Sequence, residues 1–269
     1  MSTTFDFVMS EHPAWQPTTS GCHRVFALLD GGHYLATTNG RELVVRPLTG
    51  STREPTLDVF TFSNGMLSEV PELATALLGL GIVARFRNAD LWDAIGTAII
   101  RQVIRAGQSK KLYRAFCEAY GERVAPPGGG TYTLFPSPEI VLKLTSEHFA
   151  SIGMAFKRRP LLAAAEAYLE HGAKWRESPP RVLIDDLQVV PRIGPWTAHA
   201  AVADWSNDWA LYPYADLAVR TWATRAAPSY DWPRDEPSFG RIWRALAGDH
   251  LSALTLLTLA WGSRHGDIG

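Results

Sequence analysis

The spacing of the apolar residues changes near residue 89, and this change limits the folds that the chain can adopt. Before that point, short apolar segments alternate with turn sequences, and Asn39-Gly40 between two such segments is the strongest short hairpin signal. From Leu91 onward, apolar residues recur at intervals of three and four, which is the period of an α-helix with one buried face. We therefore predict an α+β chain, with a small β-rich N-terminal domain over residues 1–86 and an all-helical domain over residues 87–269.

Composition excludes several classes of protein. The chain has 269 residues, enough to bury a sizeable core, and its longest apolar run, residues 251–261, is too short to cross a bilayer. Cys22 and Cys117 are its only cysteines, too few for a disulfide framework, a four-cysteine zinc site or a four-cysteine iron–sulfur cluster. The first residues lack the basic-then-apolar pattern of a signal peptide. We expect a cytoplasmic monomer without a bound metal of these kinds.

The charge distribution is compatible with nucleic-acid binding but does not require it. The formal net charge is −1, whereas many nucleic-acid-binding domains are basic. Basic residues nevertheless cluster within residues 101–114 and again at residues 157–159. Either cluster could contact phosphates. For any single cluster, a solvated helix face is the favoured interpretation.

The most informative segment is a short turn between two predicted helices, residues 182–187 and residues 195–202. The turn reads Val-Val-Pro-Arg-Ile-Gly over residues 189–194, and Pro195 stands at the first helical position, where proline is favoured. So short a turn leaves backbone N–H groups unpaired at the start of the second helix. Together with the helix dipole, these groups form an anion site that suits a DNA phosphate. Spacing alone favours an ordinary helical corner.

Three other segments accompany this turn. Residues 91–103 form an apolar helix that ends in Arg-Gln-Val, residues 152–158 read Ile-Gly-Met-Ala-Phe-Lys-Arg, and residues 212–220 carry Asp216 in front of a predicted helix. In this order, and with Val-Pro-Arg-Ile-Gly-Pro-Trp-Thr-Ala over residues 190–198, they resemble the helix-hairpin-helix superfamily of DNA glycosylases. The resemblance covers about residues 91–261 and is strongest to 3-methyladenine DNA glycosylase II, which also begins with a β-rich domain. It implies a helical domain of two lobes with a cleft between them.

Two positions of the hairpin bear on what the resemblance implies. Arg192 stands where the family has a glycine that permits a positive φ, so it could alter the turn or reach a phosphate with its own charge. Family members that form a Schiff base and cut the DNA backbone carry a lysine where this chain has Trp196. An amine is the nucleophile that this chemistry needs. The resemblance therefore implies a monofunctional enzyme that uses water and has no lyase activity.

Asp216 matches the catalytic aspartate of the family. Breaking an N-glycosidic bond builds positive charge on the sugar, and a nearby carboxylate can stabilise this charge and orient or deprotonate a water molecule. An aspartate in front of a helix is also a common N-cap. Both roles can hold at once, because a capping side chain is held rigidly.

The resemblance also suggests a base pocket and DNA contacts. A flipped-out base needs an aromatic, partly apolar slot, and the aromatic residues that could form it, or could equally pack in the core, are Trp196, Tyr212, Tyr214 and Trp261. Val103 falls at the position of the side chain that fills the gap left by the base. The other predicted DNA contacts come from the neighbouring turn and the hairpin: Arg101, Gln102, Arg105, Arg192, Ile193, Gly194 and Thr197.

We therefore predict a DNA N-glycosylase of base excision repair that flips a damaged base out of double-stranded DNA. Alkylated purines are the first expectation, because a cationic base is a good leaving group. Two alternatives stay open: a non-catalytic helix-hairpin-helix DNA-binding protein, and a glycosylase specialised for an unusual adduct or a free nucleoside. No cofactor is expected, apart from the monovalent cation that hairpin carbonyls bind in members of this family. When bound to DNA, the protein would be associated with the nucleoid.

Overall fold

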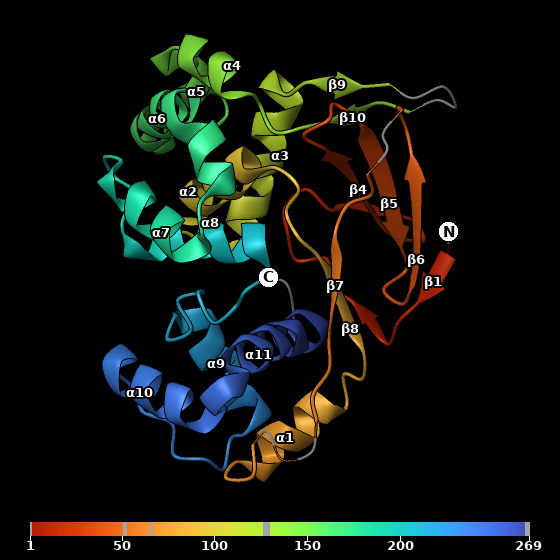
Figure 1. Ribbon diagram of the computed structural model, residues 1–269, viewed down its shortest axis with the longest axis vertical. Coiled ribbons are helices and arrows are strands. Elements are labelled where there is room, and N and C mark those ends of the chain that lie inside the picture. Colours follow the sequence, from red (N-terminus) through yellow and green to blue (C-terminus); the bar gives the residue numbers. More distant parts are fainter. Residues whose placement is uncertain (1, 51–52, 64, 66, 126–129, 267–269) are drawn as a thin grey trace.

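The computed structural model describes residues 2–50, 53–63, 65, 67–125 and 130–266 (Figure 1). A five-stranded antiparallel sheet opens the chain, and its strands run in the order β1-β6-β5-β4-β3. The predicted Asn39-Gly40 hairpin is confirmed: it joins β5 to β6, and Gly40 has φ +97°. The Asn39 side chain accepts hydrogen bonds from the backbone N–H groups of Arg41 and Glu42. In chain order the strands are β1 (Ser2–Thr4), β3 (Gln16–Thr18), β4 (Gly21–Ala27), β5 (His33–Thr38) and β6 (Glu42–Pro47).

A second, three-stranded sheet connects this part to the helices. Strand β8 (Val83–Phe86) lies between β2 (Phe7–Val8), which is parallel to it, and β7 (Leu57–Phe60), which is antiparallel. Between β7 and β8 the chain forms α1 (Pro71–Leu78), which buries Leu73 and Leu77. Helix α1 packs against α9 and α11, so the N-terminal 86 residues contribute one helix to the C-terminal helical group (Figure 1).

The remaining helices form two groups, which lie one above the other in Figure 1. The upper group surrounds α2, whose residues 91–100 are all buried because α3, α6 and α8 pack around it. Its helices are α2 (Leu91–Arg101), α3 (Ala106–Tyr120), α4 (Pro138–Lys143), α5 (Ser146–Ser151), α6 (Arg158–Glu177), α7 (Pro180–Val189) and α8 (Pro195–Ser206). A short ladder of β9 (Arg123–Val124) and β10 (Tyr132–Thr133) and the 3-10 helix η1 (Ala155–Lys157) accompany them. The lower group contains α9 (Leu217–Ala226), α10 (Glu236–Ala247), η2 (Gly248–His250) and α11 (Leu251–His265).

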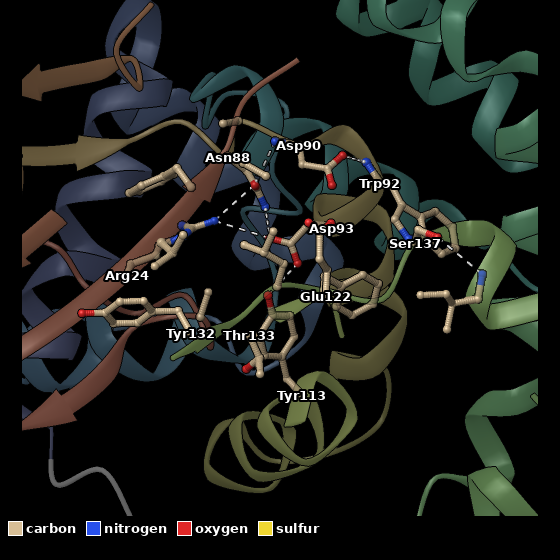
Figure 2. A pocket seen from close by; sticks show the side chains of 18 of the residues that line it. Arg24, Asn88, Asp90, Trp92, Asp93, Tyr113, Glu122, Tyr132, Thr133 and Ser137 are labelled. Carbon is tan, nitrogen blue, oxygen red and sulfur yellow. Dashed lines mark hydrogen bonds and ion pairs between the residues drawn. The ribbon is translucent and has the colours of Figure 1, made fainter. Parts of the chain in front are cut away.

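A buried polar network joins the first sheet to the upper helices. Asn88 Nδ2 donates to Asp204 Oδ2 at 2.8 Å and to Asp93 Oδ2 at 3.1 Å, and Tyr113 donates its hydroxyl to Asp93 Oδ1 at 2.8 Å. Arg24 of β4 completes the network with bonds to Asn88 and Asp93 (Figure 2). Arg24, Asn88, Asp93 and Tyr113 also line a cavity of about 400 Å³ between β4 and α2. Removing Arg24 or Asp93 would leave the other as a buried charge without this partner, so the network holds the sheet in one position on the helices.

Two further observations concern the described part of the chain. None of its helices is long and apolar enough to cross a membrane. It also contains no cluster of three or more His, Cys, Asp or Glu side chains with the arrangement of a metal site.

Candidate functional site

Asp216 is fixed by three hydrogen-bond donors at the start of α9. It is the N-cap of this helix, and its Oδ1 accepts the backbone N–H of Ala218. Its Oδ2 accepts the hydroxyl of Tyr212 at 2.8 Å and the indole Nε1–H of Trp196 at 3.1 Å. Trp196 belongs to the first turn of α8, so the side chain is oriented by both helical groups. Asp216 itself remains partly exposed.

Arg101 at the end of α2 supplies positive charge beside this carboxylate. Its guanidinium lies 5.8 Å from the ring centre of Trp196. Burial opposes the charge of Arg101, but the Asp216 carboxylate nearby favours it, and the pKa of the guanidinium lies above its ordinary value. Burial also raises the pKa of Tyr212, against the influence of Arg101 and with that of Asp216. The Tyr212 hydroxyl therefore stays protonated and donates to Asp216.

A cavity of about 220 Å³ adjoins this group, between the two sets of helices. Arg101 lines it from α2 and Ala218 from α9, while residues 9–13 close it from the N-terminal part. Its aromatic walls are Trp209 and Trp222. The indole of Trp222 rests on Gly262 of α11 and on Gly266, the C-cap of that helix: a Cβ on either glycine would lie 2.3 Å from ring atoms. The signal in the sequence was a pair of glycines four residues apart at the end of an apolar helix.

The aromatic residues that the sequence suggested for the base pocket take different places. Trp196 and Tyr212 both donate hydrogen bonds to Asp216, and Tyr212 does so from the protein interior, where it is only 2% exposed. Tyr214 lies against Gly240 of α10. Trp261 stacks on His265 along α11, with ring centres 4.7 Å apart. None of these four aromatic residues lines the 220 Å³ cavity, and neither does Asp216; of the residues around the carboxylate, Arg101 and Ala218 line it.

The hairpin between α7 and α8 keeps its turn despite Arg192. This residue adopts φ +70°, the left-handed conformation that the family glycine would provide, and its side chain is exposed. Pro195 begins α8 as predicted. The backbone N–H groups of Gly194, Trp196 and Thr197 donate to no described residue. They form an unpaired set of donors at a helix N-terminus, which suits an anion.

The turn from α2 to α3 lies beside this hairpin. Gln102 Nε2 donates to Thr197 Oγ1 at 2.7 Å and to the Arg192 carbonyl at 3.3 Å. Val103 follows with φ +60°, and its side chain is fully exposed at 102% of the reference area. Arg105 is exposed at the start of α3.

Three residues predicted as DNA contacts have inward-facing side chains. Arg101 is directed to Trp196 and Asp216 instead of to solvent. Ile193 is 4% exposed and packs in the core, and Thr197 is 3% exposed because it accepts the bond from Gln102. The side chains of Ile193 and Thr197 pack inward, so the outer surface of the hairpin is formed by its backbone and by the exposed Arg192 side chain. Nearby, His199 Nδ1–H donates to the Leu211 carbonyl at 2.7 Å, which is a structural role.

Comparisons with known proteins agree with this architecture. A DNA-3-methyladenine glycosylase of Bacillus subtilis is 27% identical over 114 residues, which are 41% of this chain and 37% of that protein. No model of a known protein family matches the chain. The solved structure of a 3-methyladenine DNA glycosylase from Archaeoglobus fulgidus superposes with a TM-score of 0.70 at 17% identity, over 99% of both chains.

An 8-oxoguanine glycosylase/lyase of Clostridium acetobutylicum, solved with double-stranded DNA, superposes with a TM-score of 0.66 at 16% identity, over 95% of this chain and 89% of that one. The similarity to both structures extends over the N-terminal sheets as well as the helices, which confirms the α+β fold that the sequence predicted. The chain therefore has the same fold as these two DNA glycosylases.

Proposed function

We propose that this protein is a DNA N-glycosylase that releases a damaged base from double-stranded DNA as the first step of base excision repair. The observation that carries the proposal is Asp216, a partly exposed carboxylate held by Tyr212, Trp196 and the α9 backbone beside a cavity with aromatic walls. The relatives support the same class, since the similar proteins are themselves named as DNA glycosylases.

In the proposed reaction, Asp216 stabilises the positive charge that develops on the sugar as the base leaves. A carboxylate offers about four lone-pair positions. Two on Oδ2 are taken by Tyr212 and Trp196, and one on Oδ1 is taken by the Ala218 N–H. The remaining position on Oδ1 can hold the attacking water against the sugar carbon. The three donors keep the charge in place before the reaction, so little reorganisation is needed when the cation forms.

Water is the proposed nucleophile, and no lyase step is expected. The hairpin position at which lyase members of the family carry lysine is Trp196, whose indole N–H is bonded to Asp216. A tryptophan cannot form a Schiff base with the sugar. The product should therefore be an intact strand that contains an abasic site.

Alkylated, cationic purines are the proposed substrates. An indole face attracts cations, and the cavity wall includes Trp222, over which the Arg225 guanidinium lies 5.0 Å from the ring centre, so a cationic base would replace or share this contact. Glu11 adds a carboxylate to the cavity wall, although it is paired with Arg85 at 2.7 Å. Arg101 and Lys110 also line the cavity, and burial lowers the pKa of the Lys110 amine.

The proposed DNA surface combines the unpaired N–H groups of the hairpin with Arg105, Arg192 and the exposed side chain of Val103. The protein would bind as a cytoplasmic monomer. The reaction needs no cofactor. The carbonyls of Val190 and Arg192 each accept one hydrogen bond and keep a second lone pair, so these neutral oxygens fit a monovalent cation, which would steady the turn.

The test is base release from duplexes that each carry one modified base: 7-methylguanine, ethenoadenine, hypoxanthine, uracil or 8-oxoguanine. We expect release of an alkylated purine, with strand breaks only after added alkali. Binding to DNA without release of any base would support the non-catalytic alternative. Release from a modified nucleoside but not from any duplex would support the second alternative. Strand cleavage without alkali, with a covalent adduct trapped by borohydride, would refute the water mechanism.

A further inference from the structure

Lys157 is a buried lysine without an acidic partner. It is 3% exposed, and no carboxylate of the described residues lies within 4.0 Å of its ammonium group. Burial lowers its pKa from the ordinary 10.5 to about 8. Burying a charge without a counter-ion costs free energy, and the ammonium group of Lys157 has only one hydrogen bond and the Phe156 ring, 5.1 Å away, to offset this cost.

The hydrogen bond of Lys157 identifies what it holds. Its Nζ donates to the backbone carbonyl of Gln102 at 2.7 Å. Gln102 is the C-cap of α2, where the helix dipole places negative charge, so a cation is favoured at this carbonyl. The bond connects η1 to the end of a helix 55 residues earlier in the chain.

Gln102 is also held from its other side. Its side-chain amide donates to Thr197 Oγ1 and to the Arg192 carbonyl, both in the hairpin segment. Its backbone is thus fixed by Lys157 and its side chain by the hairpin, which makes it the link between the predicted phosphate site and the α2–α3 turn. The next residue in the chain is Val103.

Val103 needs such support because its conformation is unfavourable by itself. A β-branched residue at φ +60° is a true outlier, and its fully exposed side chain makes no contact that could compensate. Strained residues of this kind persist only where the surrounding structure holds them, and they are frequent at functional sites. The Lys157–Gln102 bond acts on the residue directly before the strained one.

We propose that Lys157 is a positioning residue that fixes Gln102, so that Val103 is held outward for insertion into the DNA duplex. The inference rests on the proposed function only in requiring DNA as the ligand. The buried Lys157 ammonium group has no counter-ion, but its hydrogen bond fixes the turn between α2 and α3 before DNA binds. Lys157 itself touches neither the base nor the sugar.

The test replaces Lys157 by methionine, which is of similar length and carries no charge. Insertion is measured as the fluorescence gain of 2-aminopurine placed opposite a stable abasic-site analogue, a readout that requires no base release. Base release from a modified duplex is measured in parallel. Lys174→Met is the matched control, since Lys174 is exposed and paired with Asp186 at 2.9 Å.

We expect Lys157→Met to lose most of the fluorescence gain and to release base about tenfold to a hundredfold more slowly, as small misplacements at a site can do. Its melting temperature should equal or exceed that of the unchanged protein, because a desolvated charge is gone. A merely structural role predicts the opposite, a lower melting temperature with the fluorescence gain retained, and that result would overturn the proposal. Lys174→Met should match the unchanged protein in both assays.

A double-mutant cycle shows whether Lys157 acts through Val103. Val103→Gly removes the inserting side chain and relieves the positive φ. In that background Lys157→Met should add less than about a twofold further loss, because the two changes disable the same step. Fully additive losses would overturn the proposal. If the unchanged protein gives the fluorescence gain but releases no base, the glycosylase activity is refuted and this inference stands. If the unchanged protein gives no fluorescence gain but releases base, the inference alone is overturned.

Discussion

Replacing Asp216 by asparagine tests the role of its charge, and the hydrogen bonds around it set the expected magnitude. In the carboxylate, Oδ1 accepts one donor and Oδ2 accepts two. Asparagine offers only one oxygen. If this oxygen caps α9, the amide nitrogen faces the Trp196 N–H, and if it faces Trp196, the nitrogen meets the Ala218 N–H. In either orientation the amide NH2 group of the asparagine faces another N–H donor. The Tyr212 hydroxyl can rotate and accept a hydrogen bond from the NH2 group, but the N–H groups of Trp196 and Ala218 cannot.

The variant should therefore lose activity and some stability. Loss of a charge that stabilises a developing cation reduces base release by about two to three orders of magnitude, which corresponds to about 3–4 kcal/mol. The unsatisfied donor lowers the free energy of unfolding by about 1–3 kcal/mol. The first quantity is measured as single-turnover base release under saturating enzyme, and the second by urea unfolding. DNA affinity should persist or rise slightly, because one negative charge leaves a phosphate-binding surface.

Tyr212→Phe is the matched control. It removes one donor to Oδ2 and keeps the carboxylate, so base release should fall only about tenfold, as expected for one hydrogen bond to a charged group. The reasoning is refuted if Asp216→Asn retains full activity below its melting temperature, or if Tyr212→Phe loses as much activity as Asp216→Asn.

Three further predictions follow from single positions. Arg192→Gly should raise the melting temperature, because glycine adopts φ +70° at about 1 kcal/mol less cost. The affinity for DNA should fall and should depend less steeply on salt. Unchanged affinity and salt dependence would show that Arg192 does not reach a phosphate. Burial and then Asp93 raise the pKa of Asp90 from 3.8 to about 6, so its charge costs stability above pH 6 and this cost disappears below about pH 4. Asp90→Asn, which still caps α2, should thus be more stable than the unchanged protein in urea unfolding at pH 7.5 and equal to it near pH 4; an equal difference at both pH values contradicts the assignment. Gly262→Ala should displace the Trp222 ring and slow base release, with DNA affinity retained, and an unaltered rate would exclude Trp222 as a wall of the base pocket.

The sequence by itself determined the elements whose causes are local. The change of period near residue 89 predicted sheets before helices, Asn39-Gly40 predicted the first hairpin, and Pro195 marked the start of α8. Asp216 was identified by its motif, because a short segment carries both the capping role and the proposed catalytic one. These features depend on neighbours within a few residues, which a sequence displays directly.

Only the tertiary structure decided which side chains meet. Trp222 lines the cavity because Gly262 and Gly266 leave room for its ring. Tyr214, close to Asp216 in the sequence, and Trp261, in an apolar helix, do not line it. Arg101 turned inward to Asp216, since the aromatic and acidic groups there offset its burial. The bond from Lys157 to Gln102 joins distant segments. Such contacts depend on how helices pack across the whole chain, and packing is settled by the shapes and charges of partners that the local pattern does not contain.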